Sequence, residues 1–201
     1  MESLAYQLSN KVYPDGYHEE VRTELLNGII VAMSPRPFLK HNKVAGNIHN
    51  IFRNYLKKRP CEVYFEVDVH LTKNDKVVPD IVVVCNKDII KANAIYGAPD
   101  LVVEVLSRST RARDKGYKLN LYEKSGVREY WIVDAQNLSI DVYLPENESG
   151  RLMLTYTYDI FYDYELENMT DEEKAAIPHE FKTSLFDDLI IKLGDVFDGI
   201  E

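Results

Sequence analysis

Two short apolar segments constrain the fold of this 201-residue chain more than any other feature. Residues 77–85 (VVPDIVVVC) and 101–106 (LVVEVL) are apolar on both faces, which is typical of strands in the middle of a sheet. Each segment nevertheless contains a carboxylate, Asp80 or Glu104. An isolated ionised carboxylate in a buried strand is costly unless it is paired or binds a metal ion. The sequence therefore predicts an acidic site built on two central strands.

Hydrophobic periodicity predicts the elements around these strands. Asn27-Gly28 between apolar runs predicts a β-hairpin within residues 20–33. Apolar steps of three and four predict two helices, over residues 41–58 and 113–124, and further strands are expected at 62–71, 129–133, 139–144 and 152–158. We therefore predict a single α/β domain over residues 1–201. It has a mixed β-sheet flanked by helices, an N-terminal β-hairpin and a C-terminal β-rich extension.

The charge is distributed unevenly along the chain. The formal net charge is −9, but residues 1–133 hold 20 Lys/Arg against 16 Asp/Glu, whereas residues 134–201 hold 4 against 17. A basic stretch from Arg36 to Arg59 contains no acid. Contact with nucleic-acid phosphates through the first part of the chain is compatible with the net sign, although a solvated basic face explains the stretch equally well.

The remaining composition favours a soluble protein of the cytoplasm. No run approaches the roughly 18 apolar residues of a membrane span, and the first residues lack the layout of a secretory signal. Cys61 and Cys85 are isolated in the sequence and show neither CxxC spacing nor nearby paired histidines. We therefore expect two reduced thiols, with no disulfide framework and no zinc site.

A longer pattern follows the two carboxylates. Pro79-Asp80, the run Pro99 to Ser107, then Asp114, Lys118 and Tyr122, and finally Glu129 to Asp134 closely resemble the Uma-type restriction endonucleases of the PD-(D/E)XK nuclease superfamily. The resemblance covers nearly the whole chain. It implies a restriction-endonuclease-like core and a Mg²⁺ or Mn²⁺ ion held by Asp80, Glu104 and the backbone carbonyl of Val105.

The lysine of the superfamily signature is missing from its usual position. Leu106 stands two residues after Glu104, where a Lys is expected. The resemblance assigns that role to Lys118, which would orient the attacking water and stabilise charge on the phosphate. Spacing alone favours equally an exposed ion pair between Lys118 and Asp114, four residues apart on a helix.

Other residues have weaker claims on the site. Glu24 matches a recurrent acid of the family and is a candidate catalytic residue, although an exposed strand acid is as good an interpretation. Arg108, Arg111 and Arg113 follow the second acidic strand and are candidate phosphate contacts, or else members of a solvent-exposed loop. The histidines His41, His49 and His70 show no ligand spacing, so we assign them to surface or packing.

The acidic site and the family resemblance together favour a metal-dependent DNA endonuclease. The resemblance also implies a homodimer. Its interface would contain the tyrosine-rich strands near Tyr143, Tyr156, Tyr158 and Tyr162. Two alternatives stay open. The site has decayed and the chain is an inactive nuclease-fold binding or regulatory module, or it hydrolyses another phosphorylated substrate.

Overall fold

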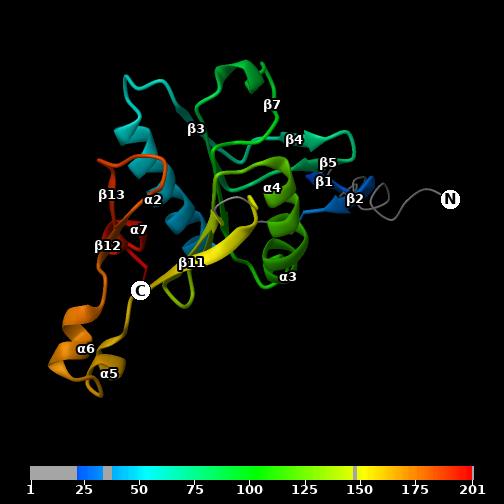
Figure 1. Ribbon diagram of the computed structural model, residues 1–201. Coiled ribbons are helices and arrows are strands. Elements are labelled where there is room, and N and C mark those ends of the chain that lie inside the picture. The colour runs from blue at the N-terminus through cyan, green and yellow to red at the C-terminus, as the bar shows by residue number, and fades with distance from the viewer. Residues whose placement is uncertain (1–21, 34–37, 147–148, 201) are drawn as a thin grey trace, which may run out of the picture.

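The computed structural model describes residues 22–33, 38–146 and 149–200, and its centre is a six-stranded mixed sheet. Helix α2 (Leu39–Tyr55) covers one face of this sheet and helix α4 (Leu119–Ser125) lies on the other (Figure 1). This arrangement confirms the predicted α/β class with a mixed sheet flanked by helices. Within the described residues, no helix has the length and apolar character needed to cross a membrane.

The central sheet has the strand order β11-β10-β9-β8-β6-β3. Its members are β3 (Glu62–Phe65), β6 (Ile81–Val84), β8 (Leu101–Val105), β9 (Glu129–Asp134), β10 (Ser139–Pro145) and β11 (Leu152–Asp159). The strands β8 and β9 are parallel, whereas every other neighbouring pair is antiparallel. Strands β6 and β8 are internal and fully buried, as their apolar sequences predict.

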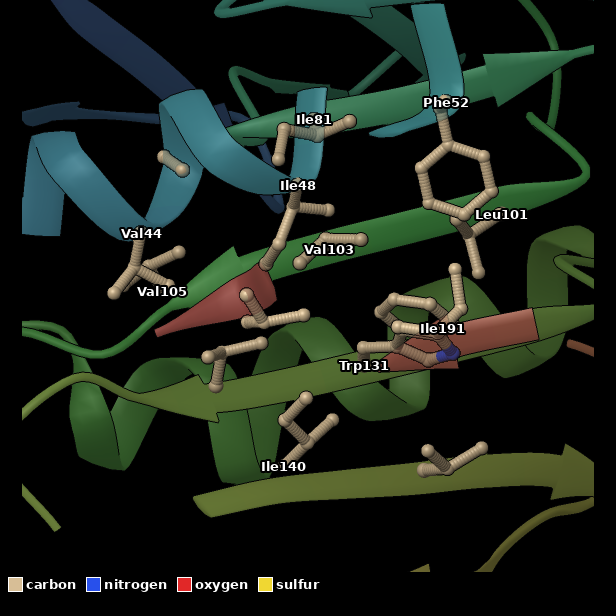
Figure 2. Close-up of a cluster of buried hydrophobic side chains, with 14 of the residues drawn as sticks. Val44, Ile48, Phe52, Ile81, Leu101, Val103, Val105, Trp131, Ile140 and Ile191 are labelled. Carbon is tan, nitrogen blue, oxygen red and sulfur yellow. The ribbon is translucent and has the colours of Figure 1, made fainter. Parts of the chain in front are cut away.

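Strand β8 divides its side chains between two cores. Leu101, Val103 and Val105 pack with α2 in one cluster, which also contains Trp131 of β9 (Figure 2). Val102 packs in the opposite cluster, together with residues of α4. Because side chains alternate along a strand, Glu104 shares the face of Val102. Its carboxylate therefore lies on the α4 side of the sheet.

A second sheet of five strands, in the order β2-β1-β5-β4-β7, adjoins the same face. Its strands are β1 (Thr23–Leu26), β2 (Ile29–Ala32), β4 (Val69–Thr72), β5 (Asp75–Val77) and β7 (Ile95–Tyr96). The predicted hairpin is confirmed for β1 and β2, and its turn residues Asn27 and Gly28 have φ angles of 51° and 76°. A two-residue turn with both φ angles positive matches the right-handed twist of the strands.

Two strands that were predicted as continuous are each broken in two. The segment 62–71 forms β3 and β4, which belong to different sheets, and Glu66 between them has a φ of 48°. The segment 77–85 likewise separates into the end of β5 and the whole of β6, with Val78-Pro79-Asp80 between them. Each half buries its own face, so the alternation in the sequence continues across the break and hides it. The prediction of single strands was wrong at both places.

The helix predicted after β8 is present, but it begins earlier and is irregular. It consists of α3 (Arg111–Arg113), the π-helical turn η2 (Asp114–Lys118) and α4. Gly126, with a φ of 87°, ends it as expected. Turns of this π type interrupt α-helices frequently at functional sites.

The C-terminal part adds a small layer on the α2 side. It contains α5 (Asp163–Leu166), α6 (Asp171–Ala176), β12 (Glu180–Lys182), β13 (Ile190–Lys192) and α7 (Leu193–Val196). Thr170 caps α6 through a capping box with Glu173, as its sequence indicates. Phe181 and Ile191 pack in the cluster under α2. A short 3-10 helix, η1 (Lys87–Ile89), follows β6.

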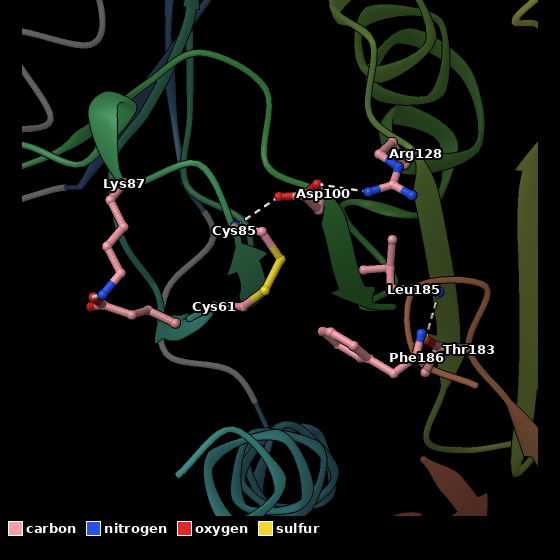
Figure 3. The surroundings of a disulfide bond; sticks show 9 residues. Cys61, Cys85, Lys87, Asp100, Arg128, Thr183, Leu185 and Phe186 are labelled. Carbon is pink, nitrogen blue, oxygen red and sulfur yellow. Dashed lines mark hydrogen bonds and ion pairs between the residues drawn. A yellow bond between two sulfur atoms is a disulfide. The ribbon is translucent and has the colours of Figure 1, made fainter. Parts of the chain in front are cut away.

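The two cysteines form a disulfide, contrary to the expectation of isolated thiols (Figure 3). Strands β3 and β6 pair antiparallel with Glu62 opposite Val84. Cys61 directly precedes β3 and Cys85 directly follows β6. The register therefore places them opposite one another, with their Cα atoms 4.0 Å apart. Strand register depends on the tertiary fold, so the spacing of 24 residues in the sequence could not reveal the pair.

Candidate active site

Asp80 lies at the beginning of β6 and is held by two neighbouring elements. Its Oδ2 accepts a hydrogen bond from the backbone N–H of Val105 at 2.7 Å. The same oxygen lies 3.3 Å from Nε2 of His41, in the first turn of α2. The backbone of Val105, expected to offer its carbonyl to a metal ion, thus also positions Asp80 through its N–H. The assignment of His41 to surface or packing was wrong, because it contacts a predicted site residue.

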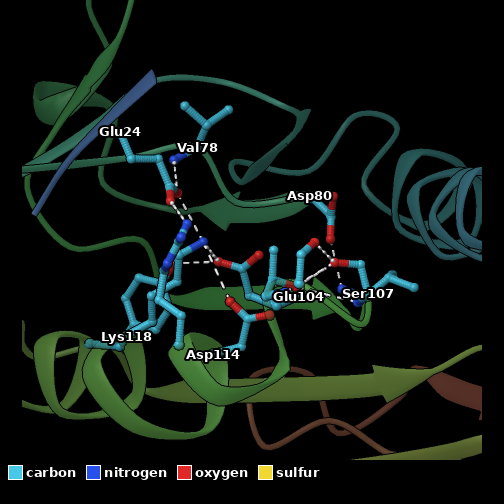
Figure 4. A network of polar contacts seen from close by, with 12 residues as sticks. Glu24, Val78, Asp80, Glu104, Ser107, Asp114 and Lys118 are labelled. Carbon is cyan, nitrogen blue, oxygen red and sulfur yellow. Dashed lines mark hydrogen bonds and ion pairs between the residues drawn. The ribbon is translucent and has the colours of Figure 1, made fainter. Parts of the chain in front are cut away.

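Glu104, near the end of β8, makes a buried network with the following helix (Figure 4). Its Oε1 accepts hydrogen bonds from Nζ of Lys118 at 2.9 Å and from the hydroxyl of Tyr122 at 2.7 Å. Among the described residues, no donor contacts Oε2. Tyr122 matched the family pattern in the sequence, but only the fold shows that it bonds Glu104.

Lys118 is buried among three carboxylates. Its Nζ lies 2.9 Å from Oε1 of Glu104, 2.9 Å from Oε1 of Glu24 and 3.6 Å from Oδ1 of Asp114. The ion pair with Asp114 therefore exists, but it is buried, and the interpretation of an exposed helical pair was wrong. The helix thus carries Lys118 to Glu104, although 14 residues separate them in the sequence.

Glu24 reaches the same network from the N-terminal hairpin. Only 2% of the residue is exposed, so the alternative of an exposed strand acid was wrong. Its Oε1 also accepts a hydrogen bond from the backbone N–H of Val78 at 3.1 Å, and its Oε2 lies 3.2 Å from Arg113. Both oxygens are engaged, which indicates that Glu24 holds Lys118 and the segment before Asp80 in place.

The electrostatics of the network follow from burial. Burial raises the pKa of Glu104 to about 8; Lys118 opposes this shift, while the charges of Asp114, Asp80 and Glu24 increase it. Burial lowers the pKa of Lys118, but the carboxylates beside it outweigh burial and raise that pKa overall. Burial and Glu104 raise the pKa of Tyr122. At neutral pH, Lys118 is therefore an ammonium and Tyr122 a neutral donor.

The network holds more negative than positive charge. Three carboxylates (Glu24, Glu104 and Asp114) lie within 4 Å of Lys118, Asp80 lies close enough for its charge to act on Glu104, and Arg113 pairs with Glu24. Both carboxylate oxygens of Asp114 are buried without a hydrogen bond, and burial raises its pKa. A buried carboxylate that has an ion pair but no hydrogen bond remains costly unless it gains a proton or a further cation. The cluster can therefore accommodate an additional cation.

The three arginines predicted to contact phosphate differ in their partners. Arg111 donates to Asp134 at 2.6 Å, and Arg113 is used by Glu24. Arg108 is exposed. Two of the three arginines thus stabilise the fold around the site, and Arg108 is the exposed one for which no carboxylate partner is found among the described residues. Arg36, at the start of the basic stretch, lies outside the described residues.

The donor set fits a hard cation in part. In the portions of the chain that the structure describes, no three His, Cys, Asp or Glu side chains are grouped as ligands of one metal ion. Asp80 and Glu104 offer carboxylate oxygens at the same end of the sheet, and Mg²⁺ commonly uses one or two carboxylates with waters. Such an ion fits the excess negative charge of the network. It also fits Oε2 of Glu104, which accepts no hydrogen bond from the described residues.

The fold and this acidic site define a nuclease-type α/β protein, and comparison with known proteins agrees. Residues 9–162 match the family model Uma2, described as "Putative restriction endonuclease". The chain belongs to this family. It is 29% identical over 155 residues to "Uncharacterized protein slr1290" of Synechocystis sp., a match that covers 73% of this chain and 80% of the relative.

A solved structure supports the fold. A crystal structure from Anabaena variabilis, described as "a putative nuclease belonging to DUF820", superposes with a TM-score of 0.63. It is 21% identical to this chain and covers 87% of it, with 89% of the other chain matched. At this identity the likeness shows the restriction-endonuclease-like fold alone.

Proposed function

We propose that this protein is a Mg²⁺- or Mn²⁺-dependent endonuclease that hydrolyses phosphodiester bonds in DNA. The observation that carries the proposal is the pair of acids Asp80 and Glu104 at one end of the central sheet, with Glu104 in a buried cluster where the Lys118 ammonium faces three carboxylates. Asp80, Glu104 and the carbonyl of Val105 would hold the ion. When bound, it would supply Lewis acidity to the scissile phosphate.

The residues of the chain have separate roles in this proposal. Lys118 presents an ammonium beside Glu104, where it can orient a water molecule and stabilise negative charge that develops on the phosphate. Glu24 and Tyr122 fix the positions of Lys118 and Glu104. Arg108, exposed near the same end of the sheet, is the first candidate for a contact to the DNA backbone.

Nicking of supercoiled plasmid tests this proposal. The wild type should convert the plasmid to the open-circular form in Mg²⁺ or Mn²⁺ and not in EDTA, whereas Asp80→Ala should be inactive. Equal nicking by the two proteins would refute the assignment, because a contaminating nuclease would then explain the activity.

One observation favours the second candidate function, an inactive nuclease-fold module that binds or regulates. Leu106 occupies the usual lysine position, and no three-residue ligand group is found among the described residues. This candidate predicts neither nicking nor Mn²⁺ binding. A calorimetric titration in which the wild type binds Mn²⁺ and Glu104→Gln does not would count against it.

We also propose that the protein forms a homodimer through the edge strand β11. Its outer edge has no strand partner among the described residues, and Leu152 to Tyr158 contain neither a charge nor a proline. Met153, Leu154 and Tyr156 are exposed there. Uncharged edge strands tend to pair with another chain. Light scattering should give the dimer mass for the wild type and the monomer mass for Leu154→Lys; a monomeric wild type would exclude the dimer.

We propose that the protein works in the cytoplasm, because a DNA substrate and the composition of the chain both favour that compartment. Disulfides are rare in that compartment, so the Cys61–Cys85 pair is expected to be reduced there. Activity should therefore be measured with and without a reductant. Export of the full-length chain in a cell-fractionation experiment would contradict this location.

A further inference from the structure

His41 is a polar residue whose surroundings are not explained by packing. It lies in the first turn of α2, with 12% of its side chain exposed, and its Nε2 is 3.3 Å from Oδ2 of Asp80. Its other ring nitrogen, Nδ1, is buried and makes no hydrogen bond. A buried polar atom without a partner is destabilising. An apolar side chain would avoid this cost, so stability alone does not account for a histidine here.

The contact with Asp80 accounts for it. Two elements contact the same carboxylate oxygen of Asp80: the Val105 N–H of β8 donates to Oδ2, and Nε2 of His41 on α2 lies 3.3 Å from it. Together the two contacts restrict the rotation of the carboxylate. Neither contact involves Oδ1, so we assign that oxygen to another ligand.

We propose that His41 is a positioning residue that orients the Asp80 carboxylate toward a divalent cation. The inference rests on the proposed function, because it assigns His41 a role toward the ion that Asp80 and Glu104 would hold. Residues that hydrogen-bond a metal ligand in this way typically change metal affinity by about 10- to 100-fold when they are removed. His41 itself does not need to touch the ion or the substrate.

Three substitutions separate this role from a purely structural one. His41→Leu removes the donor and fills similar space, whereas His41→Gln keeps an N–H group near the position of Nε2. His49→Leu is the matched control, since His49 lies two turns further along α2 and packs on the ring of Phe65 without contacting a carboxylate of the site.

The experiment is calorimetric titration of the metal-free proteins with Mn²⁺, together with thermal unfolding without metal. We expect His41→Leu to weaken Mn²⁺ binding by about 10- to 100-fold. We expect His41→Gln to restore most of the affinity and His49→Leu to leave it unchanged. The unfolding temperature of metal-free His41→Leu should not fall, because the substitution removes an unpaired buried nitrogen.

Three negative results have different meanings. If the wild type binds Mn²⁺ and folded His41→Leu binds it equally well, His41 has no positioning role, while the proposed metal site stands. If the wild type itself binds no Mn²⁺, the metal-dependent function fails and the role of His41 fails with it. A loss of unfolding temperature in both His41 variants, with unchanged Mn²⁺ affinity, would assign the residue to packing.

Discussion

Two buried glutamates on neighbouring strands have opposite surroundings. Glu129 begins β9 and is fully buried, yet its oxygens accept hydrogen bonds from the indole N–H of Trp131 and from the backbone N–H and hydroxyl of Ser184. Glu104, near the end of β8, has donors on one oxygen only, and one of them is an ammonium. Neutral donors on both oxygens are sufficient for a structural carboxylate. The incomplete set at Glu104 is what the metal ion of our proposal would complete.

The same contrast extends to the two ends of the central sheet. At the end that begins β8, Asp100 accepts from the backbone N–H of Cys85 at 2.7 Å and from Arg128 at 3.2 Å, beside the disulfide (Figure 3). At the other end, Asp114 is left without a hydrogen bond. The first end is therefore well paired, whereas at the other end the buried Asp114 has an ion pair with Lys118 but no hydrogen bond. Unsatisfied buried charge distinguishes a candidate site from a structural ion pair.

The largest effect is expected from Glu104→Gln. Plasmid nicking should fall by at least about 100-fold, the scale observed when one electrostatic contact to developing charge is lost. The unfolding temperature should change little, because the raised pKa of Glu104 leaves this group largely protonated at neutral pH and glutamine has a similar shape without charge. Rates of nicking and thermal unfolding measure the two effects.

Glu129→Gln is the matched control for that variant. It places an amide N–H₂ against three donors, so it should lower the free energy of unfolding by about 1–3 kcal/mol while the folded protein keeps its activity. The comparison between the two glutamates breaks down if Glu129→Gln abolishes nicking in folded protein.

Lys118→Met tests the charge balance of the cluster. Among the described residues, Lys118 is the only ammonium within 4 Å of Glu24, Glu104 and Asp114, and loss of one partner of a buried ion pair costs about 3–5 kcal/mol. Glu24 alone keeps another cationic partner, Arg113. Urea unfolding at neutral pH measures this loss. Lys115 lies on the same helical segment as Lys118 and makes an exposed ion pair with Asp141 of β10. Lys115→Met should therefore lower the free energy of unfolding by at most about 1 kcal/mol.

Reduction of the Cys61–Cys85 disulfide tests whether the two ends of the central sheet are independent. The disulfide joins residues 24 positions apart, and loss of a cross-link over that separation should lower the free energy of unfolding by about 3 kcal/mol. Mn²⁺ affinity, measured by calorimetry, should not change, because the disulfide lies at the opposite end of the sheet from Glu104. A reduced protein that remains folded and no longer binds Mn²⁺ would show that the two ends are coupled.

The last effect is the dependence of stability on pH, which is small per pH unit. The pKa of Glu104 is raised to about 8 by burial and by the surrounding acids, well above its value in an unfolded chain. The folded protein therefore binds more protons between about pH 4.5 and 8, so this group makes stability fall as pH rises through that window, by at most about 1.4 kcal/mol per pH unit. Unfolding of the metal-free protein should show this slope, and Glu104→Gln should reduce it. Identical slopes would place the titration elsewhere.

The sequence by itself determined the central strands, the hairpin at Asn27-Gly28 and the cap at Thr170. Each of these is a local signal, since apolar runs, turn residues and capping residues act over a few positions. The sequence also indicated Asp80 and Glu104, because a carboxylate inside an apolar strand is conspicuous wherever that strand lies. The resemblance to a known family added Lys118 and Glu24.

Only the tertiary structure decided which distant residues meet. The disulfide follows from the register of β3 and β6, and the breaks at Glu66 and Pro79 follow from the division of the chain between two sheets. The contact of His41 with Asp80 depends on where α2 crosses the end of β8. Such contacts join residues tens of positions apart, and periodicity carries no information about them. Local patterns therefore showed which residues are unusual, and packing decided which of them lie together.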